Sequence, residues 1–140
     1  MDLKIELDSK GINWGDFTQI LKKEGMAYHT PEIHQKAFEN SHTVVFAFDG
    51  YNLIGIGRAI SDGTYQAAIY DMAILPKYQG KGLGRIIMQH ILKNIGNYNI
   101  IGYAAPGMEE FYKKFGFRKM KTGMALFQKH EKMHKKGFIE

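Results

Sequence analysis

The sequence contains no cysteine among its 140 residues. This absence excludes a disulfide framework, zinc sites built on thiolates and any cysteine nucleophile. It also suits a protein of the reducing cytosol, so we expect a cytoplasmic location. Proline is scarce as well, and the three prolines stand at the boundaries of predicted elements.

Long hydrophobic runs are also missing. The longest uninterrupted apolar stretch in a predicted strand covers only residues 44–48, whereas a membrane-spanning helix needs about 20 apolar residues. The start of the chain, from Met1 to Glu6, mixes charged with apolar groups. The sequence therefore predicts no membrane segment, no membrane partner and no secretory signal.

The remaining composition is that of a folded domain. Hydrophobic residues make up 44% of the chain and charged residues 24%, which is enough apolar surface for a buried core. The length corresponds to one ordinary domain. We predict a single domain over residues 1–140, with a core from about residue 3 to 129 and a basic tail over 130–140.

Positive charge is concentrated at the C-terminal end. Residues 1–112 carry ten Lys and Arg against twelve Asp and Glu, and residues 113–140 carry nine against two, for a net charge of +5. Three interpretations compete: a solvated tail, a field that attracts a small polyanionic ligand, and a nucleic-acid contact. The nucleic-acid interpretation is disfavoured because no basic element carries interleaved aromatic residues.

The hydrophobic pattern predicts a mixed α+β sheet. Helical spacing covers residues 14–23 and 83–95, and Thr30-Pro31 marks the start of a helix that ends near residue 39. Turns at Asp49-Gly50 and Asp62-Gly63 join three strands into an antiparallel meander. Its strands are predicted over residues 43–48, 53–60 and 66–75. Beyond residue 95 we predict a strand over 99–105, a helix over 108–115 and strands over 117–119 and 124–128.

Three glycines, Gly80, Gly82 and Gly84, lie between the third strand of the meander and the helix that follows. Backbone N–H groups of such a loop and of the first helical turn form an anion site that suits a phosphate or pyrophosphate. A Walker A loop is excluded because Gly82, not Ser or Thr, follows Lys81. A dinucleotide fingerprint is excluded because Arg85 stands where its last glycine belongs.

Residues 71–84 contain the pattern Gln-x-x-Gly-x-Gly, and residues 111–117 read Phe-Tyr-Lys-Lys-Phe-Gly-Phe. In this order the two blocks resemble the GNAT superfamily of acetyl-CoA-dependent N-acetyltransferases, and the element order extends the resemblance over residues 14–128. The resemblance implies a mixed, mostly antiparallel central sheet flanked by helices. It also implies a splayed cofactor cleft between the strand ending at Leu75 and the strand ending at Ala105.

The resemblance further implies acetyl-CoA as cosubstrate and no metal. The residues expected to bind it are Met72, Ala73, Ile74, Gln79, Gly80, Lys81, Gly82, Leu83, Gly84, Arg85 and Tyr112. Part of the C-terminal positive charge would then attract the phosphates of coenzyme A. His130 and His134 are spaced like a metal pair on a helix, but we interpret them as part of a solvated end because no third ligand is evident.

Catalytic roles follow from the same resemblance. Tyr112 matches the family's tyrosine and is expected to protonate the leaving thiolate; packing against the cofactor is the alternative. Asp71 is the best-placed carboxylate for a base or for amine binding, with a structural hydrogen-bonding role as its alternative. Tyr70 would face away from Asp71 on a regular strand, although a bulge would change this. Tyr28, His29 and Tyr70 are the expected acceptor-site residues.

These residues lead to one predicted activity. We expect direct transfer of acetyl to a small primary amine, of arylalkylamine or polyamine type, in a ternary complex. The alternatives are a protein lysine or N-terminal acetyltransferase and a non-catalytic acyl-CoA-binding module. A homodimer is left open. Residues 57–63 and 69–71 also resemble the family branch that contains plastid serotonin-type acetyltransferases and small bacterial relatives.

Overall fold

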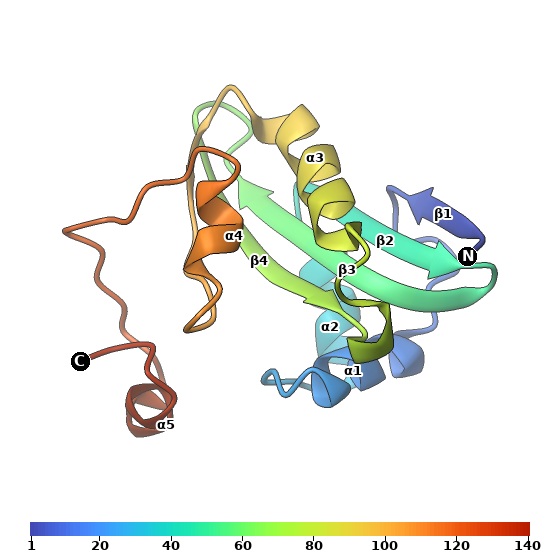
Figure 1. The fold of residues 1–140 in the computed structure, drawn as a ribbon, viewed down its shortest axis with the longest axis horizontal. Coiled ribbons are helices and arrows are strands. Elements are labelled where there is room, and N and C mark those ends of the chain that lie inside the picture. Colours follow the sequence, from blue (N-terminus) through green and yellow to red (C-terminus); the bar gives the residue numbers. More distant parts are fainter. The chain divides into compact units, whose positions relative to one another are not determined.

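A computed structural model describes residues 1–140, the whole chain (Figure 1). The chain divides into two compact units, Met1–Gly102 and Tyr103–Glu140. The first unit holds the entire β-sheet, and the second holds two short helices and no strand. None of the helices, of which the longest spans 13 residues, is long and apolar enough to cross a membrane.

The first unit is built on a five-stranded sheet in the order β1-β2-β3-β4-β5. Its strands are β1 (Leu3–Glu6), β2 (Thr43–Asp49), β3 (Asn52–Ser61), β4 (Gln66–Ile74) and β5 (Asn99–Ile101). Neighbouring strands are antiparallel, except that β4 and β5 are parallel. The predicted mixed, mostly antiparallel sheet and its central meander are confirmed, whereas β1 was not predicted.

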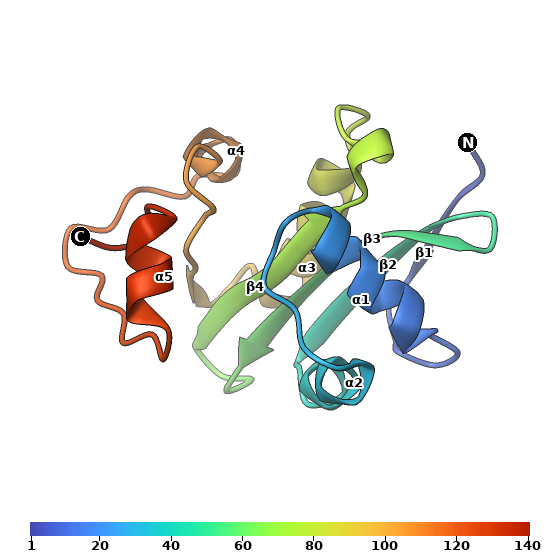
Figure 2. The same cartoon turned by 90° about the horizontal axis from the view of Figure 1, so that it is seen from below.

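Helices cover both faces of this sheet. They are α1 (Trp14–Lys23), α2 (Pro31–Glu39) and α3 (Leu83–Ile95), and a short 3-10 turn, η1 (Pro76–Tyr78), precedes α3. Figure 2 shows α1 and α2 on one face and α3 on the other. The three predicted helices of this unit are confirmed. Their apolar stripes are buried, and Phe17, Phe38, Ile87 and Ile91 are at most 1% exposed.

Local sequence fixes both ends of α1. The Asn13 side chain caps the start by accepting the Asp16 N–H at 3.1 Å. At the other end the Met26 N–H donates to the Leu21 carbonyl at 2.9 Å, and the Gly25 N–H donates to the Lys22 carbonyl at 3.1 Å. This is the Schellman arrangement, which ends the helix and starts the loop toward α2 at a defined position.

Strands β4 and β5 pair over only part of their lengths. The parallel ladder joins Gln66, Ala67 and Ala68 to β5 and ends there. Beyond it, residues 69–74 of β4 have no partner on the β5 side, although their other edge still pairs with β3. The predicted strand over 99–105 is therefore too long. β5 ends at Ile101, where its hydrogen-bonded pairing with β4 ends.

The second unit contains α4 (Glu109–Lys113) and α5 (His130–Lys135). The helix expected over 108–115 is present but shorter, and α5 was not predicted. The strands predicted over 117–119 and 124–128 are wrong. An alternating apolar pattern forms a strand only where another strand supplies hydrogen bonds, and this unit contains none. Met124 and Leu126 remain 95% and 93% exposed.

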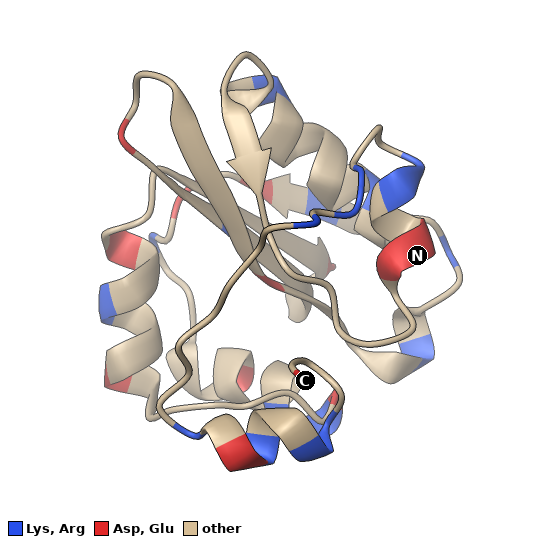
Figure 3. Cartoon of the chain, turned by 90° about the vertical axis from the view of Figure 1, so that its left-hand side faces the viewer, with Lys and Arg blue, Asp and Glu red and all other residues tan.

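Positive charge is concentrated in the second unit. Residues 113–140 of the second unit carry nine basic and two acidic side chains, and Figure 3 shows Lys and Arg in blue. The only ion pair within this unit joins the Lys113 Nζ to the Glu110 Oε1 at 3.0 Å. Both side chains are exposed, so this pair adds little stability. The basic groups therefore remain available to a polyanion.

Candidate active site

Strand β4 carries a bulge at residues 71 and 72. Its register with β3 shifts between Ile56 and Arg58, so that Gly57 alone stands opposite both Asp71 and Met72. Asp71 is the only residue other than glycine with a positive φ, at 56°. That left-handed conformation costs a residue with a side chain about 1–2 kcal/mol, and Asp is among the types that tolerate it best. Surrounding contacts must hold it.

Gly57 makes room for the bulge. A Cβ at this position would lie 2.7 Å from both the Met72 Sδ and the Ile87 Cγ2, closer than real carbon contacts allow. The Met72 side chain therefore packs between β3 and α3. Asp71 contacts residues of the opposite face, which α1 and α2 cover.

Arg58 binds the Asp71 carboxylate on that opposite face. The Arg58 Nε donates to the Asp71 Oδ2 at 2.7 Å, and the Arg58 Nη1 donates to the Ser41 Oγ at 3.3 Å. The guanidinium carbon also lies 5.6 Å from the Phe38 ring centre and 5.4 Å from that of Tyr70. The side chains are 18% and 27% exposed for Arg58 and Asp71, so the ion pair is partly shielded from water.

Tyr70 and Asp71 thus both contact Arg58 although they are neighbours in a strand. In regular β-structure consecutive side chains point to opposite faces. The bulge removes this alternation and brings the two predicted residues to one side.

His34 on α2 is hydrogen-bonded to the loop between α1 and α2, and its ring is influenced by the charges of Asp71 and Arg58. Its Nε2 accepts the His29 backbone N–H at 2.9 Å, which places the ring proton of the neutral form on Nδ1. Burial lowers the pKa of His34; the Asp71 charge opposes this, and the positive charges of His29 and Arg58 add to it. His34 is therefore a neutral hydrogen-bond acceptor that holds His29 in place.

The glycine loop follows the unpaired edge of β4. Gly82 is the N-cap of α3 with φ 82°, and Gly80 has φ 77°. Added Cβ atoms would meet nothing within 4 Å at either position, so backbone conformation rather than crowding requires glycine here. No acidic side chain lies in the first turn of α3. Its N–H groups and helix dipole are suited to an anion.

Two side chains, Gln79 and Tyr78, fix the loop to the rest of the first unit through three hydrogen bonds. The Gln79 Nε2 donates to the Ile74 carbonyl at 3.0 Å and to the Glu24 Oε2 at 2.5 Å, and so joins the end of β4 to the end of α1. Burial raises the pKa of Glu24, while the bond from Gln79 opposes that rise. The Tyr78 hydroxyl donates to the Asp49 Oδ2 at 2.7 Å. These contacts hold the start of the loop on both sides.

Tyr112 lies in the second unit, on α4. Its ring packs against Phe111 and Phe117 at centroid distances of 5.4 and 5.6 Å. Burial raises the pKa of the Tyr112 phenol above its ordinary value, so it keeps its proton at neutral pH. This protonation state is the one that an acid requires.

The structure unites some predicted residues and not others. Tyr70 and Asp71 meet at Arg58. His29 is hydrogen-bonded to His34, which interacts with Asp71 and Arg58 through their charges. Tyr28 is 48% exposed, and its ring lies 5.8 Å from the Lys22 Nζ. Arg58, His34 and Glu24 were missed. Arg58 stood within the block 57–63 that carries the shorter resemblance, and its position opposite Tyr70 emerges only from the strand register.

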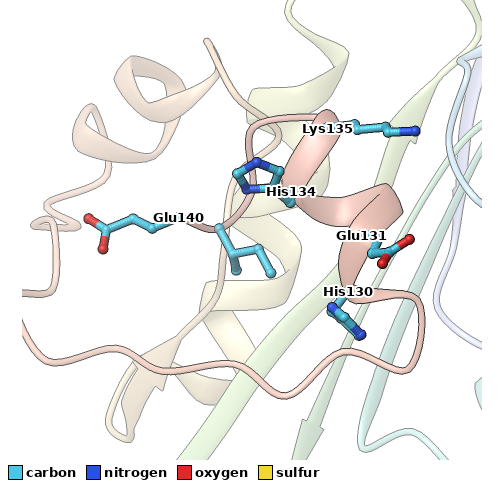
Figure 4. A pocket seen from close by; sticks show the side chains of 6 residues that line it. His130, Glu131, His134, Lys135 and Glu140 are labelled. Atoms are coloured by element: carbon cyan, nitrogen blue, oxygen red, sulfur yellow. The ribbon is translucent and has the colours of Figure 1, made fainter.

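His130 and His134 line a cavity of about 350 Å³ in the second unit together with Glu131, Lys135, Ile139 and Glu140. In Figure 4 the two imidazoles lie at different ends of α5, and the Glu140 carboxylate points away from both. The chain contains no group of three or more His, Cys, Asp or Glu side chains that could hold a metal ion.

Comparison with known proteins agrees with this geometry. The chain is 29% identical over 134 residues to the uncharacterized N-acetyltransferase ycf52 of Porphyra purpurea, an alignment that covers 86% of this chain and 77% of the relative. It is 28% identical over 120 residues to the chloroplastic serotonin N-acetyltransferase 2 of Oryza sativa subsp. japonica, covering 81% and 60% of the two chains.

Solved structures give the same result. A protein of unknown function from meticillin-resistant Staphylococcus aureus, described as a probable acetyltransferase, superposes with a TM-score of 0.78 and 31% identity, covering 89% of this chain and 98% of the other. The acetyltransferase (GNAT) domain family matches residues 14–131. The protein therefore belongs to the GNAT family and is an acetyltransferase.

Proposed function

We propose that the protein transfers the acetyl group of acetyl-CoA to the primary amine of a small molecule, by direct attack within a ternary complex. One observation carries this proposal: the bulge at Asp71 and Met72 lies in the part of β4 whose β5-side edge is unpaired, and this edge leads to a glycine loop whose N–H groups suit an anion. An acyl thioester with a long amide-containing arm and a pyrophosphate suits this succession of features.

The chain's residues fit the parts of acetyl-CoA, which supplies the acetyl thioester when bound. The β4 edge at Met72, Ala73 and Ile74 suits the pantetheine amides, which would pair with it like an added strand. The loop from Gln79 to Arg85 suits the pyrophosphate. Lys81 and Arg85 would add charge-assisted bonds to the phosphates.

Transfer of the acetyl group requires three functions from the protein. An aliphatic amine has a pKa near 10 and is mostly protonated at pH 7, so a group near it must accept a proton, and we assign Asp71 to the amine side. An N–H at Met72 or Ala73 would stabilise negative charge on the carbonyl oxygen. The protonated Tyr112 phenol would supply the proton to the departing thiolate.

The acceptor side favours an amine attached to an aromatic group. Aromatic rings are present in the loop between α1 and α2, at Tyr28 and His29, and next to Asp71, at Tyr70. A relative is named as a serotonin N-acetyltransferase, and serotonin is an arylalkylamine. Aromatic rings next to a carboxylate suit the apolar and cationic ends of such a molecule.

Thiol release from acetyl-CoA tests the proposal. The panel contains arylalkylamines, polyamines and peptides with free lysine or N-terminal amines, and mass spectrometry identifies the acetylated product. We expect the highest kcat/KM with an arylalkylamine. A higher kcat/KM for a peptide would indicate that the acceptor is a protein and not a small amine. Tight coenzyme A binding without release for any amine would indicate a binding module instead.

A further inference from the structure

The left-handed residue at the β4 bulge is held mainly by one side chain. Asp71 stands in the register gap of the β3–β4 ladder, so regular strand pairing does not fix its backbone. Its carboxylate is bound instead by Arg58, the residue directly after Gly57 on the neighbouring strand. The ion pair therefore crosses the bulge at the point where the ladder is interrupted.

Arg58 is itself fixed from three directions. Ser41, just after α2, accepts from its Nη1, Phe38 of α2 lies over one side of the guanidinium, and Tyr70 of β4 contacts it as well. A planar guanidinium can bind a carboxylate, a hydroxyl and aromatic rings at once, which an ammonium cannot do with the same geometry. The position thus requires arginine rather than any cation.

We propose that Arg58 is a positioning residue for acetyl transfer, which holds Asp71 and the backbone of Met72 in the geometry of the bulge. This inference rests on the proposed function, because Asp71 and the Met72 N–H are the groups assigned there to the amine and the carbonyl oxygen. In this role Arg58 acts through these two residues.

The first test compares Arg58→Gln, Arg58→Lys and the control Lys93→Gln, which removes one positive charge from an exposed position of α3. A displacement of about 1 Å at a reacting group lowers rates by up to about 100-fold. We expect Arg58→Gln to lower kcat by about tenfold to 100-fold. KM for acetyl-CoA should rise by a smaller factor, because Met72 also belongs to the edge that suits the pantetheine amides. Arg58→Lys should lie between Arg58→Gln and the wild type, and Lys93→Gln should match the wild type.

A double-mutant cycle tests whether Arg58 acts through Asp71. Asp71→Asn keeps an acceptor oxygen and a residue type that tolerates the left-handed conformation but removes the charge. Because the two residues form one unit, Arg58→Gln with Asp71→Asn should be no slower than the slower single variant. If the double variant instead lost kcat by the product of the two single losses, the proposal would be overturned. Independently of turnover, amide hydrogen exchange at Asp71, Met72 and Ala73 should accelerate in Arg58→Gln and not in Lys93→Gln.

The outcomes separate this inference from the proposed function. Wild-type protein that releases no thiol with any amine overturns the proposed function and the positioning role of Arg58 with it. An active wild type with a folded Arg58→Gln variant within twofold of its kcat overturns the role of Arg58 alone. If Arg58→Gln does not fold, Arg58→Lys decides: a kcat that falls by a larger factor than KM for acetyl-CoA rises supports the proposal, and any other result overturns it.

Discussion

The two units of the chain differ in what holds their side chains in place. In Met1–Gly102, helices on both sides of the sheet bury many apolar residues completely, and at the bulge Arg58 of β3 binds Asp71 of β4 beside the Phe38 ring of α2. In Tyr103–Glu140 no residue is fully buried, although some, such as Tyr112, are partly buried, and the aromatic contacts include Tyr103 with Phe127 and Phe138. The amine side of the proposed site is thus fixed by packing, whereas the assignment of Tyr112 depends on a sequence block.

The largest expected effect contrasts a buried with an exposed apolar residue. Phe17 is fully buried against Trp14, Phe38 and His34, so Phe17→Ala should lower the free energy of unfolding by about 3–5 kcal/mol. Met124→Ala in the second unit should change it by less than about 0.5 kcal/mol. Urea denaturation followed by circular dichroism measures both. A comparable loss for Met124→Ala would mean that the exposed segment packs on another surface in solution, and the contrast between the units would fail.

The next prediction asks whether the second unit takes part in catalysis. Tyr112→Phe removes only the hydroxyl, and loss of a proton donor should lower kcat by about 100-fold, the lower range for general acid catalysis. Because burial raises the pKa of Tyr112, wild-type kcat should not decline on the alkaline side until above pH 10, where the phenol loses its proton. Tyr51→Phe is the control, since Tyr51 is 99% exposed in the β2–β3 turn. A Tyr112→Phe enzyme with unchanged kcat across this range would leave Tyr112 a packing role only.

The same division explains how far the sequence alone could lead. Helices α1, α2 and α3 were predictable because caps, a leading proline and a 3.6-residue period are local properties. The bulge was not predictable, because it arises from the register between β3 and β4, and Arg58 was missed with it. The prediction of strands at 117–119 and 124–128 was wrong for the converse reason. The alternation of apolar residues is a local property of the sequence, but a strand also needs a neighbouring strand to pair with. Tyr70 and Asp71 were identified through the block next to the glycine loop, and only the structure joined them to Arg58.

The smallest expected effect contrasts a buried with an exposed histidine. His34 is 5% exposed and its pKa is lowered chiefly by burial. On lowering the pH, the unfolded chain takes up the proton first, so His34 contributes full stability above the ordinary histidine pKa near 6.5 and loses it as the pH falls through the lowered folded value. His34→Gln, which keeps an acceptor for the His29 N–H, should therefore unfold with a weaker dependence on pH between about 7 and 5.

His134→Gln, at an exposed position of α5, should follow the wild type. Thermal unfolding of the three proteins across this range measures the difference. If the stability of His34→Gln and of the wild type depended on pH in the same way, protonation of His34 would not be coupled to folding. The neutral imidazole would then have no part in holding the loop between α1 and α2.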